Sequence, residues 1–449
     1  MPTPTLPAPR CAPALAPLLP VVGAATRVPL ATGGEAVYAN LDNAASAPAL
    51  AAVAEHVARV LPHYASVHRG AGYLSRVSTE LFESARGAVG RFVGARQDDA
   101  VVFTRSTTDA LDLLSRAVPA GGRVLVADVE HHANLLPWQR SARTTVVPGG
   151  PDAAGTAAAL EAELAGGGYA LLAVTGASNV TGEVLPLRRL ARAAHAAGAR
   201  IAVDGAQLVP HRRVDLAGDD LDWIAFSGHK LYAPFGAGAL VGRRDWLDAA
   251  EPYLAGGGAT LEVGTGGVRW ASGPERHEAG SPNVLGAAAL ARACTALAAL
   301  PPGALEEHEA ALRERLLDGL AALEGVRVVR PDAEDAVGVV TFTVEGHPSS
   351  QVAAYLSAEH GIGVRDGRFC AHRFADSLGL SSGALRASTG VGTGSADVDR
   401  LLAALRRFLT AGPELRYAVV DGSWGPVGDP RPDPAGFLGA DLDRVARPR

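Results

Sequence analysis

The sequence is almost devoid of lysine, and this absence draws attention to the one lysine that is present. Of the 41 lysine and arginine residues, only Lys230 is a lysine. A primary amine can lose its proton near neutral pH and condense with an aldehyde, which a guanidinium cannot do. The lysine follows a short apolar run in the stretch Phe226-Ser227-Gly228-His229-Lys230-Leu231, a position where catalytic groups are often displayed. We therefore interpret it as a functional residue and not as a stray surface lysine.

Three further absences exclude other classes of protein. The net charge is −6 and no basic stripe is present, which argues against a nucleic-acid-binding protein. No apolar run reaches about 18 residues, so we expect no membrane-spanning helix. The cysteines, Cys11, Cys294 and Cys370, are far apart and form no C-x-x-C pair, which predicts neither a disulfide framework nor a zinc site. Unpaired cysteines are typical of a reducing compartment, and we expect a cytoplasmic protein.

Composition divides the chain into four parts. Residues 1–36 are rich in alanine and proline and lack a signal-like apolar core, so we predict a disordered leader. Residues 37–296 are expected to form a large α/β domain, whose N-terminal segment packs on a small α+β domain of residues 297–410. Residues 411–449 are rich in proline, glycine and aspartate, and we expect them to be disordered or to wrap a partner subunit.

Short β-branched runs alternate with Ala/Leu/Arg-rich helices in the large domain. Because these runs are apolar throughout, they indicate a parallel sheet covered by helices on both faces, a doubly wound α/β fold. A ligand in such a fold lies at the C-terminal ends of the strands. The expected strands are 101–104, 123–126, 171–175, 201–204 and 223–226, with helices at 48–61 and 187–197. In the small domain we expect strands at 337–344, 362–365 and 385–388, and helices at 349–359 and 395–409.

Polar side chains gather at three of the predicted strand ends. Thr107 and Thr108 follow a strand and open a helix, where hydroxyl and backbone N–H groups bind a phosphate well. Asp204 ends its strand and can pair with a protonated heteroaromatic nitrogen, and Ser227 and His229 beside the lone lysine are further phosphate donors. Together these groups predict pyridoxal 5′-phosphate as the cofactor. Taken singly, the threonines could also be helix caps, and the aspartate could begin an ordinary turn.

An ordered series of short motifs runs through residues 41–408. Through these motifs the sequence resembles the class V, fold-type I enzymes that depend on pyridoxal phosphate, and among them the SUF-type (group II) cysteine desulfurases. The resemblance implies a mainly parallel seven-stranded sheet flanked by helices, a smaller C-terminal α+β domain, and a homodimer with a shared active site. The motifs are Leu41-Asp42-Asn43-Ala44-Ala45, His68-Arg69-Gly70, Thr107-Thr108, Glu130-His131-His132-Ala133-Asn134, Ser178-Asn179-Val180-Thr181-Gly182, Val203-Asp204-Gly205-Ala206-Gln207, Ser227-Gly228-His229-Lys230, Glu278-Ala279-Gly280-Ser281-Pro282-Asn283 and Arg365-Asp366-Gly367-Arg368-Phe369-Cys370-Ala371.

The resemblance also implies a role for each residue at the cofactor. Lys230 would hold the cofactor as a Schiff base and then shuttle the α-proton of an amino-acid substrate. Asp204 would keep the pyridine nitrogen protonated, and Gln207 and Asn179 would lie at the phenolic oxygen. His131 would stack on the ring and serve in proton transfer. The phosphate would be held by Thr107, Thr108, Ser227 and His229, with Ser281 reaching it from a second subunit.

The same family places an arginine and a cysteine at the substrate. Arg386, together with Arg365, would bind the substrate carboxylate, a task that lysine performs less well. The cysteine that matches Cys370 attacks the sulfur of the substrate as a thiolate, which gives alanine and an enzyme persulfide for a sulfur-acceptor protein. Basic neighbours favour a thiolate, and this cysteine has Arg368 and His372 close by in sequence. The alternatives without a catalytic role are that Cys370 is an inert half-buried thiol and that Arg386 is a structural salt-bridge partner.

Three positions depart from the family's pattern. Gly72 replaces the second histidine of the HRGxH run, Phe369 stands where a histidine precedes the cysteine, and Arg373 replaces a proline. They surround the substrate pocket, so we predict an altered substrate or acceptor preference with the cofactor retained. We expect a desulfurase that converts L-cysteine to L-alanine. The alternatives are a C–S lyase, epimerase or aminotransferase in which the cysteine takes no part, and a non-catalytic sulfur-relay subunit.

Two remaining features have simple interpretations. The pair His131-His132 could be half of a metal site, but no third ligand lies at suitable spacing, and we expect no metal. Cys294 lies in an alanine-rich helical stretch and is expected to be a small core residue.

Overall fold

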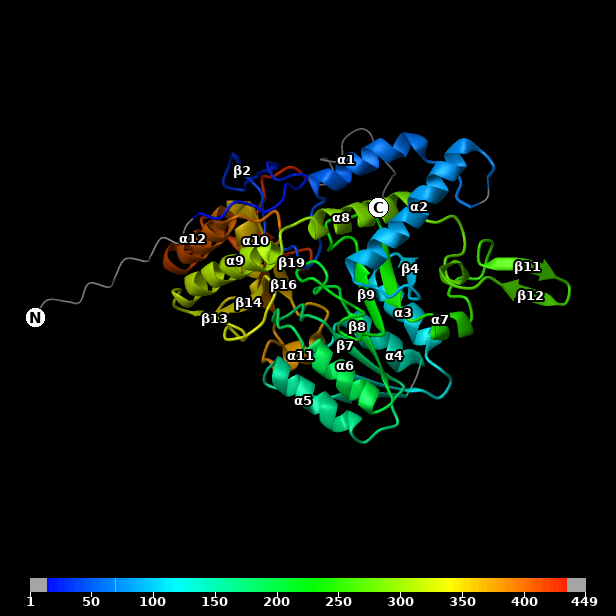
Figure 1. Ribbon diagram of the computed structural model, residues 1–449. Helices are drawn as coiled ribbons and strands as arrows, with labels where there is room; N and C mark the ends of the chain where they lie inside the picture. Colours follow the sequence, from blue (N-terminus) through cyan, green and yellow to red (C-terminus); the bar gives the residue numbers. More distant parts are fainter. Residues whose placement is uncertain (1–13, 69, 142, 434–449) are drawn as a thin grey trace, which may run out of the picture.

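The large domain is built around one central sheet. The computed structural model describes residues 14–68, 70–141 and 143–433 (Figure 1). The sheet has seven strands in the order β4-β10-β9-β8-β7-β5-β6. Strand β10 runs antiparallel to both of its neighbours, and the other strand pairs are parallel, so the mainly parallel seven-stranded sheet is confirmed. The strands are β4 (Ala100–Thr104), β5 (Arg123–Ala127), β6 (Arg143–Val147), β7 (Leu171–Thr175), β8 (Arg200–Asp204), β9 (Trp223–Ser227) and β10 (Gly238–Gly242).

Helices cover both faces of this sheet (Figure 1). Alternate residues of β7 belong to two different core clusters: Leu172 and Val174 pack in one, Leu171 and Ala173 in the other. Because successive side chains of a strand point to opposite faces, burial on both faces requires a strand that is apolar throughout. The helices of the domain are α1 (Ala51–Val60), α2 (Tyr73–Phe92), α3 (Thr107–Ala117), α4 (Leu136–Ser141), α5 (Ala153–Leu164), α6 (Leu187–Ala196), α7 (Asp245–Ala249) and α8 (Val284–Ala298), with 3-10 turns at Leu61–His63, His132–Asn134 and Pro274–Arg276.

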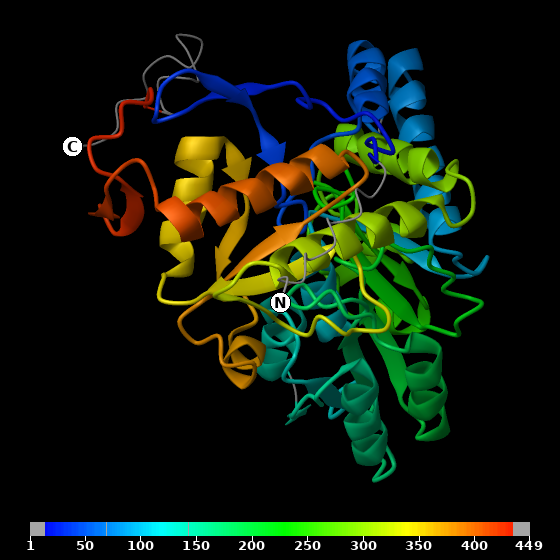
Figure 2. The ribbon, with the colours of Figure 1, turned by 90° about the vertical axis from the view of Figure 1, so that its left-hand side faces the viewer.

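The small domain contains an antiparallel four-stranded sheet with helices packed on it (Figure 2). The predicted strand at 362–365 is in fact two strands, because its halves pair with different partners. Strand β15 (Ile362–Gly363) pairs with β3 (Ala39–Asn40) from the start of the large domain, and β16 (Arg365–Gly367) pairs with β17 (Ala384–Ser388). The other elements are β13 (Val326–Val328), β14 (Val339–Val344), α9 (Ala304–Ala321), α10 (Ser349–His360), α11 (His372–Ser377) and α12 (Ser395–Ala411).

The N-terminal segment is more ordered than its composition predicts. Strands β1 (Arg27–Pro29) and β2 (Glu35–Val37) form a hairpin, and the N–H groups of Leu18 and Leu19 donate to the carbonyl of Val391. The leucine side chains pack against the main core, which offsets the entropy lost on ordering the chain. The prediction of a disordered leader is therefore wrong for residues 14–36, while residues 1–13 lie outside the described residues.

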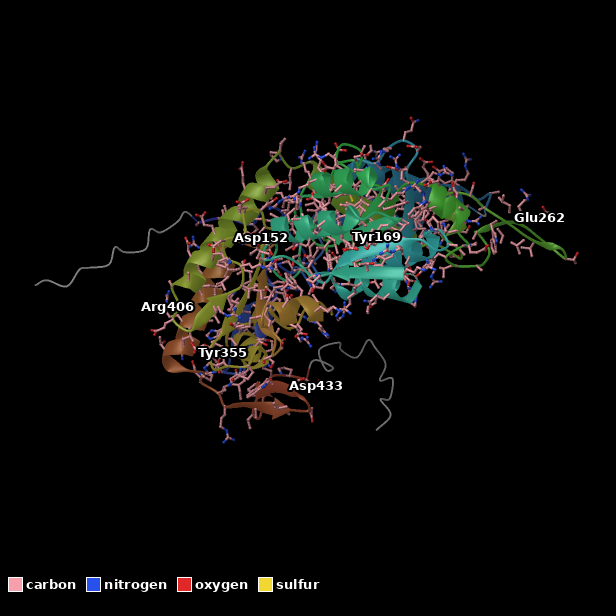
Figure 3. The ribbon with its side chains drawn as sticks, turned by 90° about the horizontal axis from the view of Figure 1, so that it is seen from below. Asp152, Tyr169, Glu262, Tyr355, Arg406 and Asp433 are labelled. Atoms are coloured by element: carbon pink, nitrogen blue, oxygen red, sulfur yellow. The ribbon has the colours of Figure 1, made fainter. Side chains whose placement is uncertain are left out.

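The C-terminal segment packs on its own chain. Strands β18 (Tyr417–Val420) and β19 (Ser423–Pro426) form a hairpin beside α10, and Figure 3 places Tyr355 of that helix and Asp433 near it. The buried carboxylate of Glu359 accepts hydrogen bonds from the N–H groups of Glu414 and Leu415 and from the Tyr417 hydroxyl, at 3.0, 3.1 and 3.1 Å. The prediction of disorder is therefore wrong for residues 411–433, contact of this segment with a partner subunit stays a prediction, and residues 434–449 lie outside the described part.

A third hairpin projects from the large domain. Strands β11 (Thr260–Gly264) and β12 (Gly267–Trp270) extend away from the body, with Glu262 far from the sheet (Figures 1 and 3). Its side chains Leu261 and Val263 are more than half exposed, at 61% and 69%. None of the helices in the described residues combines the length and apolar character that crossing a bilayer requires.

Candidate active site

A cavity of about 380 Å³ lies between the C-terminal ends of the parallel strands and the small domain. This is the position that the doubly wound fold predicts for a ligand. The cavity brings together almost all the predicted site residues. Ser281 does not line it and is exposed on the surface of the single chain. The predicted residues in its wall are Thr107, Thr108, His131, Asn179, Asp204, Gln207, Ser227, His229, Lys230, Arg365, Cys370 and Arg386.

One end of the cavity is formed by the N-terminus of α3. Ser106 caps this helix, and its side chain accepts from the N–H of Asp109. The hydroxyl of Ser227, at the end of β9, lies 2.7 Å from both the backbone nitrogen and the hydroxyl oxygen of Thr107. Hydroxyl groups and the positive end of a helix dipole therefore converge at one point, as a phosphate site requires.

Lys230 and Asp204 form the wall beside this end. Burial lowers the pKa of Lys230 to about 8, although the nearby carboxylate of Asp204 opposes the shift. Asp204 is 3% exposed and forms no ion pair with any residue that the structure describes; burial raises its pKa. A buried carboxylate that is near the lysine but forms no direct ion pair matches a ligand that brings a protonated nitrogen.

The pKa of the lysine leads to a first prediction. At pH 7 about one tenth of an amine with this pKa is neutral, compared with well under 1% of an ordinary lysine. The rate at which the apoprotein captures pyridoxal phosphate should therefore rise about tenfold per pH unit below pH 8 and level off above it. Stopped-flow absorbance near ~420 nm measures this rate. A rise that continued to pH 10 would show that the lysine is unperturbed.

His131 is held in its neutral form. Its Nδ1 accepts a hydrogen bond from the N–H of Ala133 at 3.0 Å, so the proton of the neutral ring is on Nε2. Burial, followed by the charges of Lys230, His132 and Arg386, lowers its pKa to about 3. The ring therefore presents an N–H group to the cavity and does not carry a charge at neutral pH.

Gln207 provides a test of whether the predicted cofactor fits. Its Nε2 donates to the carbonyl of Ala44 at 2.7 Å, and its buried Oε1 has no partner among the described residues. A buried amide oxygen without a donor is costly unless a ligand supplies one, and the phenolic group of pyridoxal phosphate can do so. The phosphate-binding end of the cavity, the buried Asp204 and the lowered pKa of Lys230 agree with this test, so the residues present fit this cofactor.

Arg386, on β17, is the buried cation of the cavity. Its Nη1 donates to the carbonyl of Asn179 at 3.0 Å and its Nη2 to Asp42 Oδ1 at 3.2 Å. Its Nε is buried with no hydrogen-bond partner among the described residues, and burial lowers its pKa. The resemblance assigned no role to Asp42, although it lies in a matching motif. Its pKa is raised by burial, and an incoming carboxylate would compete with it for the guanidinium.

Cys370 lies at the mouth of the cavity and is exposed. It follows β16 in a loop in which both Phe369 and the cysteine have left-handed backbone angles, with φ of 52° and 53°. The carbonyl of Cys370 accepts from the N–H of His132 at 2.8 Å, and the ring of His132 contacts that of His372 with centroids 4.5 Å apart. No group of three or more His, Cys, Asp or Glu side chains in the described part is arranged to hold a metal ion.

Comparison with known proteins identifies the class to which this fold and site belong. The chain is a member of the class-V aminotransferase family, whose model matches residues 39–401. It is a pyridoxal-phosphate-dependent enzyme of that family.

The following more particular relatives carry the name cysteine desulfurase. The cysteine desulfurase of Dickeya dadantii is 38% identical over 382 residues, which cover 82% of this chain and 92% of that protein. A probable cysteine desulfurase of Vibrio cholerae is 35% identical over 391 residues, covering 84% and 95%. The solved structure of the cysteine desulfurase CsdA from Escherichia coli aligns with a TM-score of 0.75 and 34% identity, covering 82% of this chain and 94% of that chain. The apo structure of a cysteine desulfurase from Thermococcus onnurineus NA1 aligns with a TM-score of 0.77 and 32% identity. The alignment covers 83% of this chain and 94% of that chain.

Proposed function

We propose that the protein is a cysteine desulfurase, which converts L-cysteine to L-alanine and takes up the sulfur on Cys370 as a persulfide. The observation that carries the proposal is the position of this exposed thiol at the mouth of the cavity that contains Lys230 and Arg386. The desulfurase relatives, at 35% to 38% identity over most of the chain, support it.

The residues of the cavity divide the chemistry between them. Pyridoxal phosphate, held by the groups at α3, Asp204, Gln207 and Lys230, supplies an electron sink for bonds at the substrate's α-carbon. Arg386 binds and orients the substrate carboxylate. The neutral amine of Lys230 then removes the α-proton, and the Nε2–H of His131 can donate a hydrogen bond within the cavity.

Cys370 performs the sulfur transfer. As a thiolate it attacks the substrate sulfur, so an S–S bond forms on the enzyme while the C–S bond of the substrate breaks. The electron pair of the C–S bond stays with the β-carbon; a proton added there, together with the return of a proton from Lys230 to the α-carbon, completes alanine. Because the thiol is exposed, an external thiol can collect the sulfur.

The products distinguish this reaction from its nearest alternative. The holoenzyme incubated with L-cysteine and a reductant should release sulfide and alanine in equal amounts. Pyruvate and ammonia in place of alanine would indicate elimination by a C–S lyase and would contradict the proposal.

The role of Arg386 gives a second prediction. Arg386→Lys should raise the KM for L-cysteine about tenfold or more, because an ammonium cannot form the two parallel hydrogen bonds of a guanidinium with a carboxylate. Arg330→Lys is the matched control, since Arg330 also lies over a phenylalanine ring and is ion-paired but is outside the cavity. An equal KM for both variants would contradict the proposal that Arg386 binds the substrate carboxylate.

We also propose a cytoplasmic homodimer that passes its sulfur to an acceptor protein. A second subunit would supply Ser281 to the phosphate end, and the exposed apolar side chains of the β11–β12 hairpin are suited to an interface. The free thiols Cys294 and Cys370 are compatible with a reducing compartment. Light scattering that gives twice the mass of the chain would support the dimer, and the mass of one chain would refute it.

A further inference from the structure

We propose that Phe369 is a positioning residue that links the carboxylate-binding Arg386 to the loop that carries Cys370. The inference rests on the proposed function, because it assigns the substrate carboxylate to Arg386. It concerns a position at which the chain departs from its family, where a histidine usually precedes the cysteine.

The first observation is the contact between the two side chains. The guanidinium carbon of Arg386 lies 5.2 Å from the ring centroid of Phe369, and the two residues are only 3% and 6% exposed. A desolvated cation over an aromatic ring is attracted more strongly than an exposed one. The ring thus covers a guanidinium whose Nε has no hydrogen-bond partner in the described residues.

The second observation is that Asn179 holds both residues. Its Nδ2 donates to the carbonyl of Phe369 at 2.8 Å, and its own carbonyl accepts from Arg386 Nη1 at 3.0 Å. The phenylalanine ring, the arginine and the asparagine therefore form a closed cycle of contacts. Displacing one member of a cycle strains the other two contacts, so the three residues keep one arrangement.

The third observation is the strained backbone at the end of this cycle. Phe369 and Cys370 have φ of 52° and 53°, a region that residues other than glycine adopt at an energetic cost. The Asn179 amide on one carbonyl and the His132 N–H on the next hold the turn in place. Because Cys370 follows Phe369 directly, the position of the ring against Arg386 also sets the position of the thiol.

Substrate recognition and sulfur attack are thereby coupled through one side chain. A carboxylate that binds Arg386 fixes the guanidinium, which fixes the ring of Phe369 and the left-handed turn behind it. Loss of the ring should increase the mobility of both the Arg386 guanidinium and the Cys370 thiol. A substitution of a buried phenylalanine that does not contact Arg386 should affect neither group.

The test compares three variants of the holoenzyme. Phe369→Leu keeps an apolar side chain but removes the ring face, and Phe369→Tyr restores the face. Phe374→Leu is the matched control, because Phe374 is equally buried and lies 5.1 Å from the guanidinium of Arg330, which is outside the cavity. The first readout is the KM for L-cysteine in sulfide release. The second is the rate at which iodoacetamide alkylates Cys370, followed by mass spectrometry of its peptide with and without L-alanine.

Phe369→Leu should raise KM about five- to thirty-fold, the range expected when a cation–π contact is lost. It should also accelerate alkylation of Cys370 and abolish the protection that L-alanine gives in the parent. Phe369→Tyr should behave like the parent, and Phe374→Leu should alter neither readout.

Two results would overturn the inference. One is a Phe369→Leu variant with the KM and the alanine-dependent alkylation of the parent. The other is a Phe374→Leu variant that changes both readouts as much as Phe369→Leu does. Failure of the proposed function would look different: the parent would release no sulfide, while alkylation of Cys370, which needs no turnover, would still report the contact of Phe369 with Arg386.

Discussion

Cys370→Ala should lower sulfide release from L-cysteine at least about 100-fold, because among the described residues no other thiol lines the cavity and could accept the sulfur. Binding of L-cysteine should persist, since Lys230 and Arg386, the arginine proposed to bind the substrate carboxylate, are unchanged. The measurement is sulfide release under reductant, together with the absorbance change of the bound cofactor on adding L-cysteine.

The matched control for this prediction is the other described cysteine. Cys294 is a buried residue of α8, and burial raises the pKa of its thiol, so it is an inert core residue as its surroundings predict. Cys294→Ala should keep the sulfide rate of the parent. If Cys370→Ala released sulfide as fast as the parent, persulfide formation on that residue would be refuted and the lyase alternative favoured.

Lys230→Ala should abolish both covalent attachment of the cofactor and turnover, with a loss of activity of about 1000-fold or more. The chain has only one lysine, so reduction with borohydride should attach one pyridoxal group to the parent at this residue. Peptide mass spectrometry locates the group. Lys230→Arg retains a positive charge but cannot condense with an aldehyde, and it separates the role of charge from that of covalent chemistry.

The two Lys230 variants should give the same result. A pyridoxal adduct elsewhere in Lys230→Ala, or a spectrum near ~420 nm that survives in it, would contradict the assignment. Turnover by Lys230→Arg would show that the amine is not the base.

The sequence predicted the cofactor side of the site better than the substrate side. Asp204 and Lys230 each follow an apolar run, and parallel strands bring such positions to one edge of the sheet. The contact of Arg386 with Asp42 joins the small domain to the start of the large domain, and its contact with Phe369 joins two separate segments of the small domain. No periodicity in one sequence reports such long-range contacts, so they required the structure.

Two strands of the central sheet and the structure of the leader were not predicted, and the reasons lie in their local sequences. Strand β10 is bounded by Gly238 and Gly242 and resembles a glycine-rich turn, while β6 is a partly exposed edge strand without clear alternation. The leader has a composition typical of disorder, but a few apolar residues such as Leu18 and Leu19 suffice to dock it on the core. Composition averages over a segment and cannot report which side chains find a partner.

The anchoring of the C-terminal hairpin on Glu359 limits how this chain can evolve. The family's model ends at residue 401, within α12, whereas the donors that satisfy this buried carboxylate come from residues 414–417. A chain that ended at residue 401 would leave the buried carboxylate of Glu359 without these three donors. The extension and the glutamate therefore depend on each other, and neither can be lost first without a penalty. The C-terminal hairpin and Glu359 are therefore coupled parts of one folded domain.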